Sequence, residues 1–259
     1  MTSDPPAKMA TLVAGESTVP RVTRSAVPAG KDYSDYRPYL RYDFFYSCAY
    51  CMITEAEASA IRFVIDHYEP RQACPELQHE YSNLMYACDP CNTLKGDRCP
   101  PAEARVAGLR FFRPDSDWFA DHFRLVDIRL VAESRTGWFT IEALDLNRQS
   151  LRRLREFRRR LADCDKLVSE GVLGLRHFHI DQLPPHVRGR ANGAIKKVND
   201  VAERLSDELD ELLRKNARSA LIDEDPEADN RADARATALR SWNALYPGNW
   251  RAPRSSRKT

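Results

Sequence analysis

Four cysteines in the first half of the chain form two Cys-x-x-Cys pairs. The first pair is Cys48 and Cys51, and the second is Cys88 and Cys91. Thiolates at this spacing are typical of tetrahedral structural zinc, in which the protein fills all four coordination positions. A redox-active role is the alternative, but neither pair lies in a thioredoxin-like pattern. The spacing therefore predicts a closed four-cysteine zinc site that holds shape and does not catalyse.

Residues between the two cysteine pairs are suited to phosphodiester hydrolysis. Asp66 and His67 are neighbours at the end of a short β-like run, so their side chains should point to opposite sides. Asp66 and the amide of Asn92 offer the oxygen ligands that Mg²⁺ or Mn²⁺ prefers. Neutral His67 can take a proton from water, and Lys95, on the same helix face as Asn92, can offset phosphate charge. An isolated Asp-His pair is usually structural, but between two zinc knuckles it indicates metal-assisted hydrolysis.

Short elements must position these groups. Residues 62–67 are rich in β-formers and predict a strand, and residues 84–87 predict its return partner. Asp89 suits a helix N-cap, with Pro90 in the first turn and Gly96 at the end. We therefore expect the order strand, loop, strand, helix, with one cysteine pair before the first strand and the other at the helix start.

This stretch resembles the zinc-containing HNH endonucleases. Over about residues 40–100 the motif reads Cys48-x-x-Cys51, Asp66-His67, Pro70, Asn83-Leu84, Cys88-x-x-Cys91, Asn92 and Lys95. The resemblance implies a ββα-metal fold in which His67 is the general base and Asp66 and Asn92 hold a catalytic Mg²⁺ or Mn²⁺ ion. It also implies that Asn83 braces the loop carrying the base and that Lys95 contacts phosphate.

Two features depart from the usual pattern of this family. The last histidine of the motif is Asn92 here, which still supplies a ligand. The Gly-Gly that often comes after the Asp-His segment is absent, and the loop reads Arg71-Gln72-Ala73-Cys74-Pro75. The geometry of this loop, and a role for His79 beside the site, are therefore not predicted by the family pattern.

The segments after the motif predict a hairpin and then helices. Residues 121–142 alternate and are rich in β-formers, and Gly137 interrupts the run before Trp138–Ile141 resume it, as in a hairpin. The stretch from Asp121 through Arg148 also resembles the segment next to the motif in many standalone bacterial HNH proteins. Apolar periodicity predicts helices over 144–170 and 187–221. One further short helix is expected over 231–246.

Two flanking stretches are compatible with either nucleic-acid contact or internal packing. The arginines between Arg148 and Arg160 could follow a phosphate backbone, or they could pair with the acidic face between Glu203 and Glu211. The aromatic-rich residues 33–46 are expected to pack under the zinc site, with base stacking as the alternative.

Composition sets further bounds. Among 259 residues, 40 Lys and Arg face 38 Asp and Glu, so the net charge of +2 does not itself argue for nucleic acid. The expected setting is cytoplasmic, and in such a chain the four of seven cysteines that lie in Cys-x-x-Cys pairs favour metal binding over disulfides. Cys74 and Cys99 flank the zinc motif, so exchange of one ligand is an alternative, and Cys164 is also left over. No membrane span or secretory signal is expected.

We expect an α+β chain with a ββα-metal (HNH, treble-clef-like) core braced by zinc on four cysteines, and then a β-hairpin and a helical C-terminal region. The expected segments are a disordered tail over 1–30, a nuclease domain over 31–115, a hairpin plus helical region over 116–222, and an acidic linker with a basic tail over 223–259.

The expected function is metal-dependent endonuclease cleavage of nucleic acid, with DNA as the expected substrate. The long helix and both tails leave room for a regulatory protein subunit such as an ATPase, as in an effector of anti-phage defence. The alternative is a non-catalytic zinc module that binds nucleic acid or protein, which would need neither Asp66, His67 nor Asn92. The sequence does not decide between DNA and RNA, or between nicking and double-strand cleavage.

Overall fold

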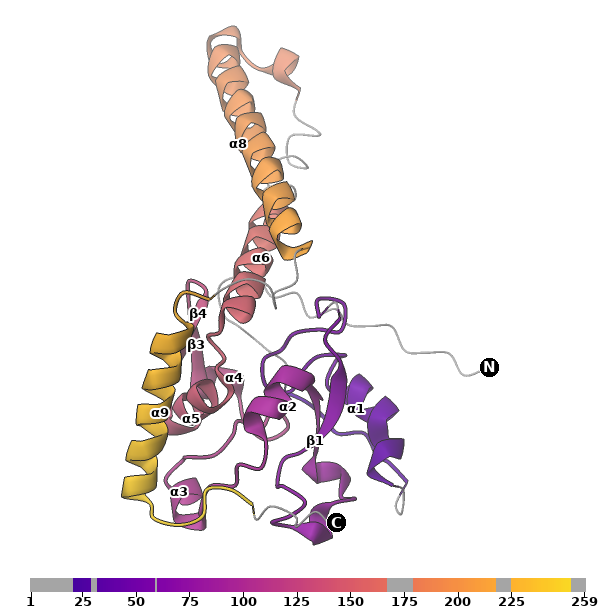
Figure 1. The fold of residues 1–259 in the computed structure, drawn as a ribbon. Helices are drawn as coiled ribbons and strands as arrows, with labels where there is room; N and C mark the ends of the chain where they lie inside the picture. The colour runs from indigo at the N-terminus through magenta and orange to yellow at the C-terminus, as the bar shows by residue number, and fades with distance from the viewer. Residues whose placement is uncertain (1–20, 29–31, 59, 167–178, 218–224, 253–259) are drawn as a thin grey trace. The chain divides into compact units, whose positions relative to one another are not determined.

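The computed structural model describes residues 21–28, 32–58, 60–166, 179–217 and 225–252 (Figure 1). The chain divides into two compact units. The first contains the described residues up to Leu151 and those from Asp225 onward, and the second begins at Arg152. The hairpin region and the last helix belong to the first unit, and the segment boundaries expected at residues 30, 115 and 222 stay predictions.

A two-stranded antiparallel sheet and one helix form the centre of the first unit. β1 (Phe63–His67) pairs with β2 (Leu84–Cys88), and α2 (Asp89–Lys95) begins directly after β2 and packs on both strands. α1 (Arg37–Asp43) packs against β2 (Figure 1). The predicted ββα order is confirmed.

Apolar burial holds this hairpin, and its end sets the start of the helix. All five residues of β2 are buried, and Phe63 stacks on Tyr86 with ring centroids 5.1 Å apart. Cys88 is the N-cap of α2, and Asp89 pairs with the exposed Arg62 at 3.1 Å instead of capping. The predicted cap is wrong because Cys88 keeps the extended backbone of β2 up to the first helical residue.

The second hairpin is shorter than expected. β3 (Phe123–Val126) pairs with β4 (Arg129–Ala132) around Asp127, whose backbone is left-handed with φ 53°. Trp138–Ile141, expected in a strand, lie instead in α5 (Arg135–Leu144). That part of the hairpin prediction is wrong.

Capping and close packing explain why α5 is a helix. The Ser134 hydroxyl accepts a hydrogen bond from the Gly137 N–H at 3.1 Å and so caps the first turn. Gly137 lies so close to α4 (Phe119–His122) that a Cβ atom there would be 1.9 Å from the His122 carbonyl oxygen. The buried residues of α5 recur at helical spacing and include Thr136, Phe139, Thr140, Ala143 and Leu144.

The last described helix packs back on α5. α9 (Ala228–Leu245) lies beside α5 although residues 145–227 separate the two helices in sequence (Figure 1). Its buried Trp242 contacts Trp138 and Phe139, with ring centroids 4.8 and 5.1 Å apart. The helix expected over 231–246 therefore exists and begins three residues earlier.

Two long helices belong wholly or largely to the second unit. α6 (Gln149–Lys166) begins later than the expected residue 144, because Asp145 adopts a left-handed backbone that ends α5. α8 (Pro185–Ala217) matches most of the helix expected over 187–221. Residues 167–170 and 218–221 of the two expectations lie outside the described residues.

Several smaller elements complete the described chain. They are η1 (Tyr33–Tyr36), η2 (Pro75–Leu77), η3 (Tyr81–Asn83), α3 (Ala102–Val106) and η5 (Ile180–Gln182). Among the described residues, no helix is both long and apolar enough to cross a membrane.

Part of the expected N-terminal tail is packed. Residues 21–28 lie against the first unit, where Arg24 donates to the carbonyl oxygen of Leu84 at 2.7 Å and pairs with Asp115 at 2.9 Å. Residues 1–20 and 29–30 of that tail, and residues 253–259 of the basic tail, lie outside the described residues.

Candidate functional site

The four cysteines of the two pairs converge. Their Sγ atoms all lie within 4.8 Å of one another, and all four side chains are buried: Cys48, Cys51, Cys88 and Cys91. The first two lie on the turn after α1, and the other two lie at the end of β2 and in α2. The Ala49 N–H donates to the Tyr86 carbonyl oxygen of β2 at 2.8 Å and so holds the turn beside the strand. Four buried thiols with this convergence fit a tetrahedral zinc ion, as the spacing predicted.

The remaining cysteines are not part of this cluster. The Cys99 thiol lies 2.7 Å from a guanidinium nitrogen of Arg105 and 3.8 Å from Oε2 of Glu69. Cys74 and Cys164 are likewise outside it. Exchange of one zinc ligand is therefore not seen.

Arg148 supports the cysteine cluster. Its Nη1 donates to the carbonyl oxygen of Leu144 at 3.1 Å, and its Nη2 lies 3.6 Å from Sγ of Cys91. A guanidinium here would offset the negative charge of four thiolates that hold a zinc ion. The sequence left open whether the arginines of this stretch follow a phosphate backbone or pair with the acidic face between Glu203 and Glu211. Arg160 pairs with Glu208 of that face at 2.8 Å.

His67 lies at the end of β1, in register opposite Leu84. Its Nε2 is 2.9 Å from the carbonyl oxygen of Gln78. Because a carbonyl only accepts, this contact assigns the proton to Nε2 and leaves the lone pair on Nδ1. Burial lowers the pKa of His67, the bond to Gln78 opposes that, and the charge of Arg71 lowers it further. The imidazole is therefore neutral at neutral pH, with Nδ1 as its basic atom.

Asn83 is bonded to the loop that orients His67. Its Oδ1 accepts from the Glu69 N–H at 2.8 Å, and its Nδ2 donates to the carbonyl oxygens of Glu69 and Leu77, both at 3.1 Å. Gln78, which contacts the imidazole, comes directly after Leu77. The buried Asn83 amide thus ties both ends of the loop, which is the contact pattern that a bracing role requires.

Asp66 points into the protein and is held by two donors. Its Oδ2 accepts from the Tyr50 hydroxyl at 2.5 Å, and its Oδ1 is 3.0 Å from Nζ of Lys95. Burial, with the Asp66 charge beside it, raises the pKa of Tyr50, so the phenol stays protonated and donates. Lys95 also donates to the His67 carbonyl oxygen at 2.7 Å and is 0% exposed. In this geometry the ammonium ties α2 to β1, and the expected contact between Lys95 and phosphate stays a prediction.

Asp66 and Asn92 can still hold a hard cation. A carboxylate has about four lone-pair positions, of which Tyr50 and Lys95 take two. Asn92 lies one turn before Lys95 on α2 and is half-buried. The oxygen donors fit Mg²⁺ or Mn²⁺, which retains several waters, but the Lys95 charge opposes tight binding.

Two side chains that sequence reasoning missed, Tyr33 and Arg71, lie on the side of the imidazole where His79 also lies. The Tyr33 ring meets His67 edge-on at 5.0 Å and lies 6.0 Å from the ring of His79. The Arg71 guanidinium lies over Tyr33 at 5.7 Å. No local pattern links Tyr33 to the motif, because the fold alone brings residue 33 beside residue 67. His79 was noted only by its nearness in sequence.

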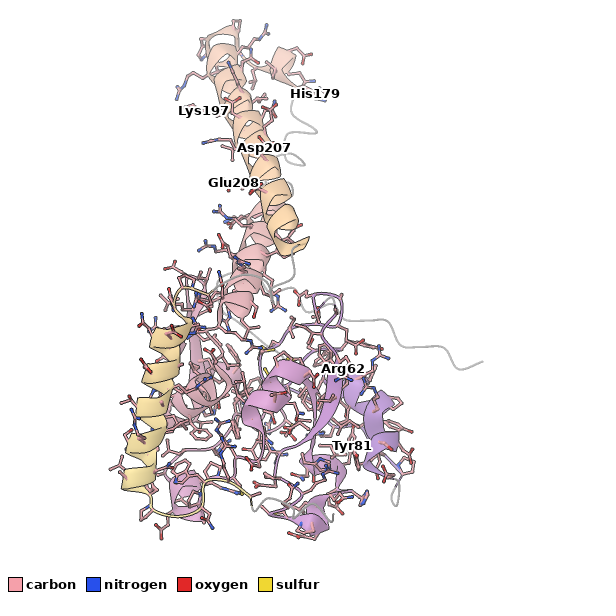
Figure 2. All side chains as sticks on the ribbon, viewed as in Figure 1. Arg62, Tyr81, His179, Lys197, Asp207 and Glu208 are labelled. Atoms are coloured by element: carbon pink, nitrogen blue, oxygen red, sulfur yellow. The ribbon has the colours of Figure 1, made fainter. Side chains whose placement is uncertain are left out.

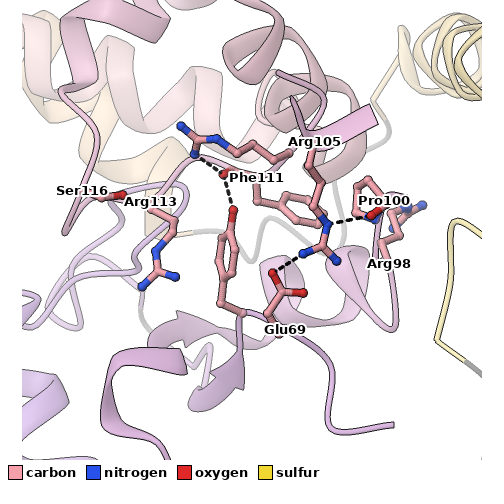
Figure 3. A pocket seen from close by; sticks show the side chains of 9 residues that line it. Glu69, Arg98, Pro100, Arg105, Phe111, Arg113 and Ser116 are labelled. Atoms are coloured by element: carbon pink, nitrogen blue, oxygen red, sulfur yellow. Dashed lines mark hydrogen bonds and ion pairs between the residues drawn. The ribbon is translucent and has the colours of Figure 1, made fainter. Parts of the chain in front are cut away.

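A pocket of about 270 Å³ opens next to the strand end (Figure 3). Its walls include Tyr68, Glu69, Arg98, Pro100, Arg105, Arg110, Phe111, Arg113 and Ser116. Arg105 pairs with Glu69, Arg110 with Asp117 and Arg113 with Asp115, each at 2.9 Å or less. Most of its positive charge is therefore neutralised by neighbouring carboxylates.

Comparison with known proteins places the site in a family. The model of the HNH endonuclease family matches residues 48–98, a segment that contains both cysteine pairs, Asp66, His67, Asn83, Asn92 and Lys95. Neither the curated proteins nor the solved structures gave a match to this chain. The chain therefore carries an HNH endonuclease domain with a four-cysteine metal site.

Proposed function

We propose that the HNH domain at residues 48–98 is a metal-dependent endonuclease that hydrolyses phosphodiester bonds, with DNA as its substrate. The observation that carries the proposal is the orientation of His67. Its Nε2–H is bonded to Gln78, and no described residue forms a hydrogen bond with Nδ1. A neutral imidazole with one nitrogen held and the other available is suited to general-base catalysis.

In the proposed reaction, Nδ1 of His67 takes a proton from a water molecule. The water oxygen forms a bond to phosphorus, and the bond between phosphorus and the 3′ oxygen breaks. The leaving 3′ oxygen takes a proton from solvent water, and the proton on Nδ1 of His67 returns to solvent, so the products are a 5′ phosphate and a 3′ hydroxyl. Asn83 keeps the loop, and with it the Gln78 carbonyl, in the position that orients the imidazole.

Asp66 and Asn92 are the residues that would hold the divalent ion. Bound there, Mg²⁺ or Mn²⁺ would stabilise negative charge on the leaving oxygen. Lys95 keeps the Asp66 carboxylate in a fixed orientation through its bond to Oδ1. The closed four-cysteine site has no open coordination position, so its metal supports the fold.

We place this activity in the cytoplasm, where thiols stay reduced and can bind zinc. A role as the effector of an anti-phage system, with a regulatory protein subunit such as an ATPase, is proposed for the same chain. The exposed side chains along α8 support a protein partner, because most of the described residues on this helix are not buried. In Figure 2 this helix carries exposed Lys197, Asp207 and Glu208.

The decisive experiment compares the chain with its His67→Ala variant on plasmid DNA and on a structured RNA. Strand cleavage is measured without added metal and with Mg²⁺ or Mn²⁺. We expect metal-dependent cleavage by the unchanged chain and a loss of about 10²–10⁴-fold in the variant, with zinc content unaltered. Cleavage that survives in His67→Ala would show that another residue is the base. Binding of nucleic acid without cleavage and without added metal would favour a non-catalytic zinc module.

A further inference from the structure

Besides the divalent ion, the proposed hydrolysis calls for a protein cation that binds the substrate phosphate beside His67, and Lys95 does not supply it. The Lys95 ammonium is enclosed between α2 and β1, where it is bonded to Asp66 and to the His67 carbonyl oxygen. The pocket arginines are mostly committed to carboxylates. The residue that binds the substrate phosphate near the imidazole must therefore be another one on the domain.

Arg71 is an exposed arginine on the loop that follows β1 and His67. It forms no ion pair with any residue in the described part of the chain, in contrast to Arg105 and Arg110. Its backbone lies in a turn in which the Pro70 carbonyl oxygen accepts from the N–H groups of Ala73 and Cys74, both at 2.9 Å. This short turn after the buried Pro70 holds the backbone of Arg71 in place, while its side chain is exposed.

Tyr33 links the guanidinium to the imidazole. Its ring lies under Arg71 at 5.7 Å and meets His67 edge-on at 5.0 Å. The Tyr33 N–H is 3.3 Å from Nδ1 of His79, whose Nδ1 is also 3.7 Å from Oδ2 of Asp32. The carboxylate of Asp32 thus faces His79. A guanidinium over an aromatic ring loses less freedom when it binds, and its planar fork matches phosphate oxygens.

We propose that Arg71 binds a phosphate group of the substrate strand beside the bond on which His67 acts, with the Tyr33 ring holding the guanidinium in place. This inference rests on the nuclease function proposed above. It assigns the phosphate contact expected of Lys95 to a residue of the loop, where the family's usual Gly-Gly is absent. Tyr33 is a positioning residue in this arrangement, and Arg71 touches the substrate.

The test measures both binding and cleavage. In a His67→Ala background, affinity for a double-stranded DNA oligonucleotide is measured at several salt concentrations. Arg71→Ala should weaken binding, and the slope of log affinity against log salt should fall by about one, as expected for one lost phosphate contact. With His67 intact, Arg71→Ala should lower kcat/KM by about tenfold or more, and Arg71→Lys should lie between the two.

Matched variants separate this role from general charge and from folding. Arg62→Ala removes another exposed arginine, which lies just before the other end of β1 (Figure 2), and should leave the cleavage rate unchanged. Tyr33→Phe keeps the ring and should behave like the unchanged chain, whereas Tyr33→Leu should approach Arg71→Ala. Zinc content and the circular dichroism spectrum should be the same throughout, because Arg71 is exposed.

The outcomes distinguish this inference from the proposed function. If the unchanged chain cleaves nucleic acid and Arg71→Ala matches Arg62→Ala in kcat/KM and salt slope, Arg71 is not the phosphate ligand. If the unchanged chain cleaves neither DNA nor RNA, the nuclease proposal fails, and the salt slopes in the His67→Ala background still decide whether Arg71 contacts phosphate.

Discussion

The Nζ atom of Lys95 lies 3.0 Å from Oδ1 of Asp66, and the lysine side chain is completely buried. The two residues join the helix and the first strand of the ββα segment, since Lys95 ends α2 and Asp66 lies in β1. Tyr50 donates to the other carboxylate oxygen. The ion pair is therefore a structural contact inside the domain, and it fixes the orientation of Asp66, the residue just before the proposed base His67.

The first prediction concerns the stability that this pair supports. Lys95→Met keeps the length of the side chain and removes its charge, which leaves the buried Asp66 carboxylate with Tyr50 as its main partner. We expect the free energy of unfolding to fall by about 3–5 kcal/mol, the usual cost of breaking a buried ion pair. Urea titration of the zinc-loaded protein measures it.

A double variant provides the control. Asp66→Asn with Lys95→Met replaces two buried charges by neutral groups, so it should recover a substantial part of the lost stability. A Lys95→Met protein as stable as the unchanged chain, but with weaker binding of nucleic acid, would instead return Lys95 to the role of phosphate ligand.

The second prediction separates the zinc cysteines from their neighbours. Cys88→Ser should lose zinc, because a closed site needs all four ligands, and its melting temperature should fall sharply, because zinc binding contributes folding free energy. Cys74→Ser is the matched control, since Cys74 lies outside the cluster and should keep one zinc per chain. Metal analysis and thermal unfolding measure both. Equal zinc content in the two variants would rule out the assignment of the four cysteines as zinc ligands.

Local signals account for the parts of the structure that the sequence predicted. The spacing of the cysteines, the β-formers from Phe63 onward and the proline at residue 90 are each read within a few neighbouring residues, and the family motif adds specificity. These signals predicted the metal cluster, the β1–β2 pairing and α2. Local signals do not tell which residue from a distant segment will contact a given side chain. The predictions that failed depended on such contacts.

Three residues show where local reasoning ended. Trp138 belongs to a β-forming run, yet a serine cap and a glycine contact place it in a helix. Lys95 has the spacing of a phosphate ligand, but its burial depends on how closely α2 packs on β1. Tyr33 reaches His67 through tertiary structure alone. In each case a contact between distant segments decided the outcome.

The third prediction tests the loop brace. Asn83→Ala removes three hydrogen bonds from a buried amide and leaves the Glu69 N–H and two carbonyl groups without their partner. We expect a loss of about 1–3 kcal/mol in stability and a larger effect on kcat than on KM, because the Gln78 carbonyl would no longer hold the imidazole firmly.

The comparison is with Asn243→Ala, which changes an exposed asparagine on α9 and should affect neither quantity. Steady-state cleavage rates and urea titration provide the measurements. If Asn83→Ala raises KM with an unchanged kcat, Asn83 acts in substrate binding and not through the loop.

The last prediction concerns the glycine that allows α5 to pack on α4. In Gly137→Ala the new Cβ atom would lie 1.9 Å from the His122 carbonyl oxygen, a contact with backbone that a rotamer change does not relieve. One of the two helices must shift, and we expect a cost of about 3 kcal/mol. Gly189→Ala is the matched change: it lies in α8, where a Cβ meets nothing within 4 Å, and the added helix propensity should stabilise that helix by about 0.5–1 kcal/mol. A lower melting temperature for Gly137→Ala and a higher one for Gly189→Ala support the packing of α5 as a helix. An unchanged melting temperature in Gly137→Ala would contradict it, because a strand at 138–141 does not require a glycine at residue 137.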